Sequence, residues 1–191
     1  MADSFELRQA TVDDAAWVTR LMADCFLAAY GDVADAATIE RHVQRTFDVE
    51  LVRAELMSGA NEFWYAVDAS QQPQGFVLLR FGGPWPDGLE DRQLAELRRF
   101  YLRPPAIGGG SAAVLMARAQ SRASERGASG LFLSVYQKAP RPLRFYEKHG
   151  FRRHAAIKFY IDHVEFDDWL MLWRVGADGA GKPASPASEA S

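Results

Sequence analysis

The sequence lacks the side chains and segments that several classes of protein need. Its 191 residues include a single cysteine, Cys25, which excludes an internal disulfide and a cluster of thiolate metal ligands. No run of about 18 apolar residues is available to span a bilayer. The first eight residues lack the basic and then apolar order of a secretory signal. We therefore expect a cytoplasmic protein with no membrane partner.

The charge pattern of a nucleic-acid-binding protein is also missing. The formal net charge is −3, and no basic block with interleaved aromatic residues occurs. The 4 histidines do not have the His-x-x-x-His spacing of a metal site, and no second thiol accompanies Cys25. We expect neither nucleic acid nor a metal ion as a partner. Because apolar residues surround Cys25, a buried structural thiol is favoured over a nucleophile.

The residues that are present suit one globular domain. Hydrophobic residues make up 48% of the chain and charged residues 25%, so a core can form without metal or disulfide support. Residues 176–191 are rich in Ala, Gly, Ser and Pro, and they contain too few large apolar side chains to offset the entropy lost on ordering. The sequence predicts one domain over residues 5–175 and a disordered tail over residues 176–191.

Hydrophobic periodicity predicts alternating strands and helices. Strands are expected where aromatic and β-branched residues run between turn residues, and helices where apolar residues recur every three or four positions. The predicted strands cover residues 5–8, 61–67, 75–81, 94–102, 131–136, 151–161 and 166–175. The predicted helices cover residues 12–30, 39–57, 110–126 and 143–149, the second in two pieces around Phe47 and Asp48. This order indicates an α/β (α+β) fold.

A strand, a glycine-rich turn and a helix follow one another from Phe100 to Met116. Glycines let successive N–H groups point inward, and the start of a helix adds about half a positive charge, so a pyrophosphate can be held without lysine. Nucleotide, dinucleotide and coenzyme A sites all use such a turn, and a flexible connection is a further alternative. A dinucleotide site is disfavoured, because such a site has its glycine-rich turn after the first strand of the domain, whereas the turn of this chain lies near its middle.

A second stretch, from Arg144 to Phe151, is a short helix that closes on a glycine and enters a strand. Its order, Phe-Tyr-x-x-x-Gly-Phe after the glycine-rich turn, resembles the GNAT superfamily of N-acyltransferases. Within the superfamily the chain is most similar to the bacterial spermidine/spermine acetyltransferases of the PaiA type. The residues that carry this narrower resemblance include Phe26 and Tyr30, the segment from Glu96 to Tyr101, and Asp168 with Met171.

The resemblance covers residues 5–175 and implies the GNAT fold. That fold has a mixed, mostly antiparallel sheet of about seven strands with about four flanking helices, and its fourth and fifth strands are parallel and splayed. It also implies acetyl-CoA as the acyl donor and a small-molecule primary amine as the acceptor, which attacks the thioester directly. The residues implied to contact the coenzyme are Phe100, Tyr101, Leu102, Ile107, Gly108, Gly109, Gly110, Ser111, Ala112 and Ala139.

Two side chains are implied in proton transfer. Tyr146 would protonate the departing thiolate, and Glu96 would accept a proton from the amine through water. Each residue has a structural alternative: Tyr146 as a packed helix tyrosine, and Glu96 as an exposed edge acid paired with Arg98 or Arg99. An N–H of the strand around Tyr101 and Leu102 would bond the thioester oxygen.

Two positions depart from the family's pattern. Ile107 stands where the family usually has Arg or Gln, and Ala139 stands where it usually has an Asn that contacts the pantetheine arm. A catalytically weak acyl-CoA-binding regulatory domain is therefore a second interpretation. The acceptor is left open, although nearby acids would favour a polycation such as spermidine. These acids are Asp32, Asp35, Glu40, Glu90 and Asp91.

The oligomeric state is also left open by the sequence. A homodimer is one alternative, because the last predicted hairpin contains Trp169, Leu170 and Trp173, which would give a second copy an apolar edge.

Overall fold

The computed structural model describes residues 5–31, 35–161 and 163–176. The strands are β1 (Glu6–Gln9), β2 (Asn61–Val67), β3 (Pro73–Arg80), β4 (Leu94–Leu102), β5 (Gly130–Tyr136), β6 (Arg152–Ile161) and β7 (Val164–Arg174). The α-helices are α1 (Ala15–Tyr30), α2 (Ala36–Thr46), α3 (Val49–Met57), α4 (Ser111–Glu125) and α5 (Pro140–Lys148). Except for Gly176, the predicted tail lies outside the described residues.

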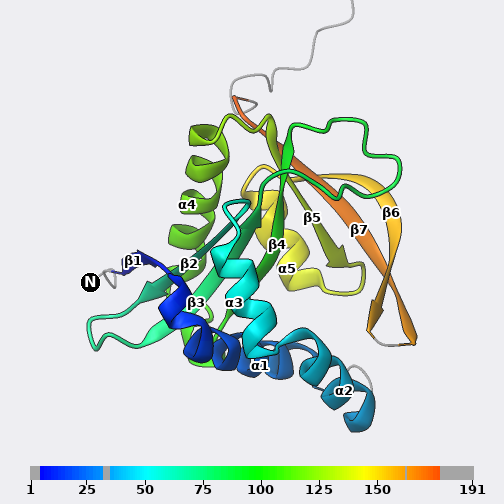
Figure 1. Ribbon diagram of the computed structural model, residues 1–191. Helices are drawn as coiled ribbons and strands as arrows, with labels where there is room; N and C mark the ends of the chain where they lie inside the picture. The colour runs from blue at the N-terminus through cyan, green and yellow to red at the C-terminus, as the bar shows by residue number, and fades with distance from the viewer. Residues whose placement is uncertain (1–4, 32–34, 162, 177–191) are drawn as a thin grey trace, which may run out of the picture.

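In the described part of the chain, the strands form one 7-stranded sheet in the order β1-β2-β3-β4-β5-β7-β6. Every neighbouring pair is antiparallel except β4 and β5. Helices pack on both sides of the sheet (Figure 1). The predicted mixed, mostly antiparallel sheet with parallel fourth and fifth strands is confirmed.

Two helix boundaries show how local chemistry sets the elements. Asp48 caps the start of α3 by accepting from the N–H groups of Glu50 and Leu51, which separates α3 from α2 as predicted. The start predicted for α5 is wrong, because the helix begins at Pro140 instead of Leu143. Proline is tolerated in the first turn of a helix, where its missing N–H would have no partner within the helix.

The two faces of the sheet bury different side chains, because successive strand residues point to opposite sides. On the back face, residues such as Leu131 and Leu133 pack against α4 and α5. On the front face, one apolar cluster lies under α1, α2 and α3, and it includes Phe76 and Phe166. A second, smaller cluster on the front face includes Phe132 and Leu170 with Leu89 and Leu94. No helix within residues 5–31, 35–161 and 163–176 is long and apolar enough to cross a membrane.

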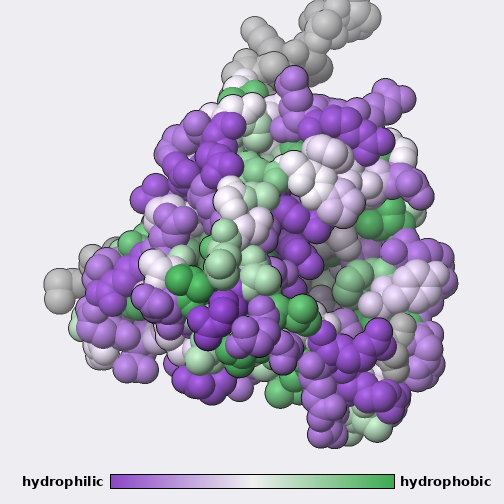
Figure 2. All heavy atoms as spheres, viewed as in Figure 1, coloured by the Kyte–Doolittle hydropathy of each residue, from purple (hydrophilic) through white to green (hydrophobic). Residues whose placement is uncertain are grey.

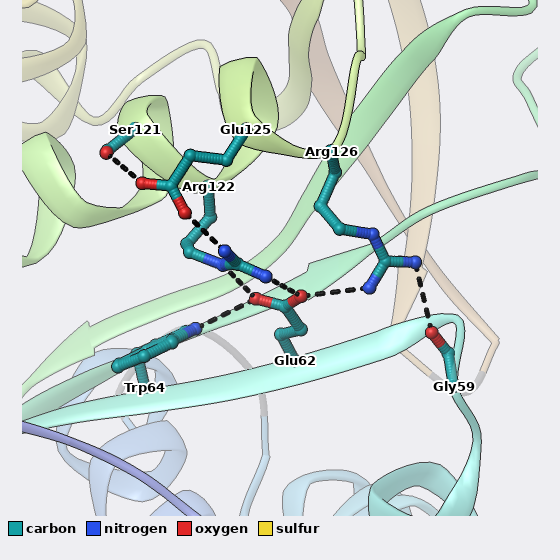
Figure 3. Close-up of polar contacts among 7 residues, drawn as sticks. All are labelled: Gly59, Glu62, Trp64, Ser121, Arg122, Glu125 and Arg126. Atoms are coloured by element: carbon teal, nitrogen blue, oxygen red, sulfur yellow. Dashed lines mark hydrogen bonds and ion pairs between the residues drawn. The ribbon is translucent and has the colours of Figure 1, made fainter.

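A buried carboxylate fixes α4 against β2 (Figure 3). Glu62 is 4% exposed, and its oxygens accept from Arg122 at 2.7 and 2.8 Å and from Arg126 at 3.0 Å. Trp64 donates its indole N–H to the same carboxylate at 3.1 Å. Burial raises the pKa of Glu62, but the hydrogen bonds from Arg122 and Trp64 outweigh burial and lower it overall. This cluster holds the C-terminal end of α4 against β2, and the apolar face of α4 packs on the sheet along the rest of the helix.

Candidate active site

The site is built where β4 and β5 separate. Their parallel pairing covers only Leu94 to Glu96 on β4 and Gly130 to Phe132 on β5, although both strands continue. Beyond these pairs the two strands diverge (Figure 1). Backbone groups that line the opening are free of the sheet ladder and can bond a ligand.

A bulge on β4 changes which side chains face each side of this opening. Leu97 pairs with Leu79 and Arg99 pairs with Leu78, so Arg98 is an extra residue on β4. Beyond it, Phe100 and Leu102 pack with the back-face cluster, whereas Tyr101 packs with the front-face cluster. The three predicted strand residues therefore flank the opening on both faces.

The glycine-rich turn has the backbone of an anion site. Gly108 and Gly110 have φ angles of +97° and +96°, which L side chains rarely adopt. No side chain caps α4, and within the described residues the N–H groups of Ser111 and Ala112 have no acceptor. Donors at the positive end of a 15-residue helix suit a pyrophosphate group.

The side chains around the turn leave these donors uncovered. The Ser111 hydroxyl is buried and has no hydrogen-bond partner in the described structure, and Gly108 and Gly110 lie at the surface. Ile107 is 42% exposed and brings no charge to the turn. Ala139 lies at the start of α5, where its N–H donates to the carbonyl of Tyr136 at 3.1 Å. Its methyl group offers no hydrogen bond to a ligand.

Tyr146 lies on α5, behind the opening. Its ring contacts Phe100 of β4 and Phe151, with centroids 6.3 and 5.7 Å apart. Burial raises the pKa of the Tyr146 hydroxyl, and the charge of Tyr30 raises it further. Tyr30 belongs to the front-face cluster, on the side of the sheet opposite Tyr146.

The front side of the opening carries two more tyrosines. Tyr30 at the end of α1 and Tyr101 of β4 have ring centroids 6.4 Å apart in a T-shaped arrangement. Burial, followed by the neighbouring Tyr30, raises the pKa of Tyr101 well above its ordinary value. Tyrosines therefore lie on both sides of the opening, Tyr30 and Tyr101 on the front and Tyr146 on the back. Tyr30 was not predicted as a site residue, although it contributed to the family resemblance.

One polar residue from each of four neighbouring strands crosses the front face between the two apolar clusters. On β5, Ser134 lies between Phe132 of one cluster and Tyr136 of the other, and on β7 Asp168 lies between Leu170 and Phe166. We call this set the polar row; its members are Arg80 of β3, Glu96 of β4, Ser134 of β5 and Asp168 of β7. Figure 2 shows the surface hollowed between α2 and the loop that follows β3, over this part of the sheet.

Glu96 is held by Arg80 across the β3–β4 ladder, with 2.6 Å between guanidinium nitrogen and carboxylate oxygen. Burial raises the pKa of Glu96, and the charge of Arg80 opposes this rise. The alternative of an exposed edge acid paired with Arg98 or Arg99 is wrong. β4 is an interior strand, and both of those arginines form ion pairs with Glu55 of α3, at 3.1 and 2.8 Å.

Asp168 contributes to the family resemblance but is not among the predicted site residues. It is 4% exposed, and one of its oxygens accepts from the Ser134 hydroxyl. Its other oxygen has no hydrogen-bond partner in the described residues, and burial raises its pKa. The sequence signal was an acid on the buried face of a strand, between Phe166 and Leu170, where alternation calls for an apolar residue.

Three of the acids expected to attract a polycation, Asp35, Glu40 and Asp91, have partners within the described residues. Asp35 caps α2 by accepting from Thr38, and Asp91 accepts from Ser129 and pairs with Arg174. Asp32 lies outside the described residues. Among the residues that are described, no group of three His, Cys, Asp or Glu side chains is placed to hold a metal ion.

The apolar edge predicted for the last hairpin is wrong. β7 lies between β5 and β6, and its side chains Leu170 and Trp173 are 1% and 7% exposed. The sheet edge at this end is formed by β6, so these residues cannot serve as an edge for a second copy.

Comparisons with known proteins identify the family of this chain. A model of the acetyltransferase (GNAT) family matches residues 20–151. An uncharacterized N-acetyltransferase of Mycobacterium tuberculosis is 36% identical over 83 residues, which are 44% of this chain and 53% of the relative. The chain therefore matches about half the length of that relative.

Two solved structures share the fold. The PaiA N-acetyltransferase from Thermoplasma acidophilum, in complex with coenzyme A, is 20% identical, covers 90% of this chain and 99% of its own, and has a TM-score of 0.73. The spermidine N-acetyltransferase from Vibrio cholerae, in complex with CoA and spermine, is 20% identical, covers 89% and 95%, and has a TM-score of 0.65.

Proposed function

Because the chain belongs to the GNAT acetyltransferase family, we propose that it moves an acetyl group from acetyl-CoA to a primary amine of a small molecule. The observation that carries this proposal is the opening between β4 and β5. It continues into a turn with unpartnered N–H donors, and Tyr146 of α5 lies beside it. We assign the whole activity to one domain over residues 5–175.

The coenzyme would be held mainly by backbone groups. The pyrophosphate would lie against the turn from Gly108 to Ala112, where Gly108 and Gly110 keep the backbone open. The pantetheine arm would enter the opening between Phe100, Tyr101 and Leu102 on one side and Ala139 on the other. The exposed surface of Gly109 and the aliphatic side chain of Ile107 would contact the coenzyme without adding charge.

Direct attack by the amine forms the new carbon–nitrogen bond and breaks the carbon–sulfur bond. An N–H near Tyr101 or Leu102 would stabilise the negative charge that develops on the thioester oxygen, by about 3 kcal/mol. Tyr146 is suited to protonate the departing thiolate because it lies beside the opening and its hydroxyl, like that of an ordinary tyrosine with a pKa of about 10, is protonated at neutral pH. Glu96 would accept a proton from the nitrogen through water.

Spermidine is the first acceptor to test. The Vibrio cholerae neighbour was crystallised with spermine, and the narrower resemblance points to the same class of amine. The polar row supplies two carboxylates on the front face, Glu96 and Asp168, and only Glu96 has a cationic partner there. An alkylammonium group would be attracted to the other.

An acyl-CoA-binding regulatory domain is the second candidate. It is favoured by Ile107 and Ala139, which bring no charge and no amide group to the coenzyme. Such a domain would bind acetyl-CoA and would not turn it over.

Two measurements test the proposed function. Thermal unfolding with acetyl-CoA, and separately with NAD, reports which nucleotide binds the native state, because only such a ligand raises the midpoint. Release of free thiol from acetyl-CoA with spermidine, lysine and other primary amines reports turnover. Stabilisation by acetyl-CoA together with amine-dependent thiol release supports the transferase. Stabilisation without thiol release from any amine supports the regulatory domain, and stabilisation by NAD alone contradicts both.

A further inference from the structure

The reaction requires the nitrogen to lose two protons. A primary alkylamine has a pKa near 10, like that of lysine, so it arrives mostly as an ammonium ion with three N–H protons, and the amide product keeps one. A single carboxylate accepts one proton at a time. Glu96 accounts for one transfer under the proposed function, on which this inference rests, and the other needs a second acceptor.

Ser134 is placed at the opening. Its strand, β5, pairs with β4 as far as Phe132. Ser134 lies two residues beyond that last pair, so its side chain is on the same face of the sheet as that of Phe132. It is exposed, whereas every other residue of β5 is buried or half-buried. The Ser134 hydroxyl therefore reaches solvent at the point where the opening begins.

Asp168 lies directly behind that hydroxyl. Ser134 and Asp168 come from neighbouring strands, and the Ser134 hydroxyl donates to one carboxylate oxygen. Asp168 is 4% exposed and its second oxygen has no partner in the described structure. The hydrogen bond from Ser134 is therefore the path by which a proton from solvent can reach the carboxylate. A buried carboxylate with a single hydrogen bond is poorly stabilised as an anion, so binding a proton or a cation would lower its free energy.

None of the charged and titratable groups described below supplies Asp168 with a proton or a cation. Burial raises the pKa of Asp168, and the hydrogen bond from Ser134 lowers it. The charge of Asp167, the preceding residue on β7, raises it further. Asp168 in turn raises the pKa of Tyr30 on α1. Lys158 of β6 is bound to Asp167 at 2.7 Å and to Glu165 at 2.6 Å. Arg80, the cation of the polar row, is bound to Glu96.

We propose that Ser134 and Asp168 form a proton relay that converts the acceptor's ammonium group into the attacking amine. The ammonium gives one proton to the Ser134 oxygen as Ser134 gives its own proton to Asp168. The neutral nitrogen then bonds to the carbonyl carbon, the carbon–sulfur bond breaks, and Tyr146 gives its proton to the sulfur. The nitrogen loses its second proton through water to Glu96. Of the two protons accepted, one restores Tyr146 and the other leaves to solvent.

The relay is tested by the pH profile of turnover with spermidine. Ser134→Ala and Asp168→Asn should each lower kcat/KM by about 10²- to 10⁴-fold near neutral pH. In these variants the rate should continue to rise with pH toward the pKa of the amine, near 10, because only the neutral amine reacts. Ser134→Thr keeps the hydroxyl on an exposed strand position and should restore most of the rate. A purely structural role would lower the rate equally at every pH, and that result would overturn the relay.

A second measurement does not depend on turnover. In protein carrying ¹³C-labelled aspartate, the Asp168 carboxyl should be ionised at about pH 8, and Ser134→Ala should raise its pKa by removing a bond to the charged form. A carboxyl that is still protonated at that pH, or that is unaffected by Ser134→Ala, would overturn the relay. Binding of acetyl-CoA without turnover of any amine would instead contradict the proposed function, and the titration would still decide the state of Asp168.

Discussion

Phe100 and Tyr101, consecutive residues of β4, pack on opposite faces of the sheet: the Phe100 ring lies 6.3 Å from that of Tyr146 on α5, and the Tyr101 ring lies 6.4 Å from that of Tyr30 on α1. Both residues lie on the part of β4 beyond Glu96, where β4 and β5 have parted. The gap therefore joins the side that carries the glycine-rich turn to the side that carries the polar row. A donor held from one side and an acceptor held from the other would meet there.

Replacing Tyr146 with phenylalanine should separate its chemistry from its packing. Phenylalanine keeps the ring contacts with Phe100 and Phe151 and removes the hydroxyl. We expect kcat to fall by about 10²- to 10⁴-fold with little change in coenzyme affinity. Single-turnover rates are the decisive measurement, since slow product release can hide a chemical defect. Equal single-turnover rates in both proteins would remove Tyr146 from the chemistry.

Gly110→Leu should weaken coenzyme binding by well over tenfold, which corresponds to more than about 1.4 kcal/mol. A φ of +96° would strain a leucine and shift the backbone that presents the N–H donors, and its Cβ would lie 3.7 Å from the Phe5 ring. Gly127→Leu is the matched control, because Gly127 has a φ of +73° at the other end of α4 and nothing lies near its position. Calorimetry with acetyl-CoA should show full affinity in the control. Full affinity in the folded Gly110→Leu variant would exclude the turn as the phosphate site.

Glu62→Gln should lower the free energy of unfolding by about 2 kcal/mol, because two arginines lose their charged acceptor in a buried place. The pKa of Glu62 is lowered in the folded state, so its contribution is present above the unfolded pKa, about 4.3, and is lost as pH falls through the folded value. Urea unfolding measures both effects. Glu125→Gln removes an exposed partner of Arg122 and should change stability by less than about 0.5 kcal/mol. Equal losses in the two variants would contradict this account.

The thiol of Cys25 should be almost unreactive in the native protein. It is 1% exposed, and burial raises its pKa to about 11, so very little thiolate is present at neutral pH. Alkylation should proceed at least about tenfold faster in denaturant, where the thiol pKa returns to about 8.5. Rapid labelling of the folded protein would show that Cys25 is accessible.

The sequence predicts the elements well where local chemistry decides them. β4 begins and ends at the predicted residues Leu94 and Leu102, because its apolar run stops before Pro104. The left-handed turn at Gly108 and Gly110 follows equally from residue type. Local sequence is sufficient in both cases.

The partners within the site depend on contacts between distant residues, and the sequence does not determine them. Glu96 pairs with Arg80 because of the β3–β4 register, and the bulge at Arg98 is visible only in that register. Asp168 meets Ser134 because β7 inserts between β5 and β6. Periodicity predicts that each of these residues lies in a strand, but it does not predict which strands are neighbours in the sheet.

Arg80→Gln should move the acidic limb of kcat/KM to higher pH. Burial raises the pKa of Glu96 and the charge of Arg80 lowers it, so removing Arg80 leaves burial less opposed and the pKa rises. If ionised Glu96 accepts a proton through water, the variant needs a higher pH to reach full rate. Arg98→Gln is the matched control, since Arg98 is bound to Glu55 and should shift the limb less.

Three profiles of amine acetylation against pH decide this prediction. Glu96→Gln should lose the part of the limb that Glu96 contributes and keep the part set by Asp168, which the relay also needs in its ionised form. Arg80→Gln should displace the Glu96 part relative to the unaltered protein and to Arg98→Gln. A limb of unchanged shape and position in Glu96→Gln would show that Glu96 does not titrate in it. A limb that stays in place in Arg80→Gln would mean that the ion pair at 2.6 Å opens before the rate-limiting step, so that Arg80 no longer acts on Glu96 when the proton is transferred.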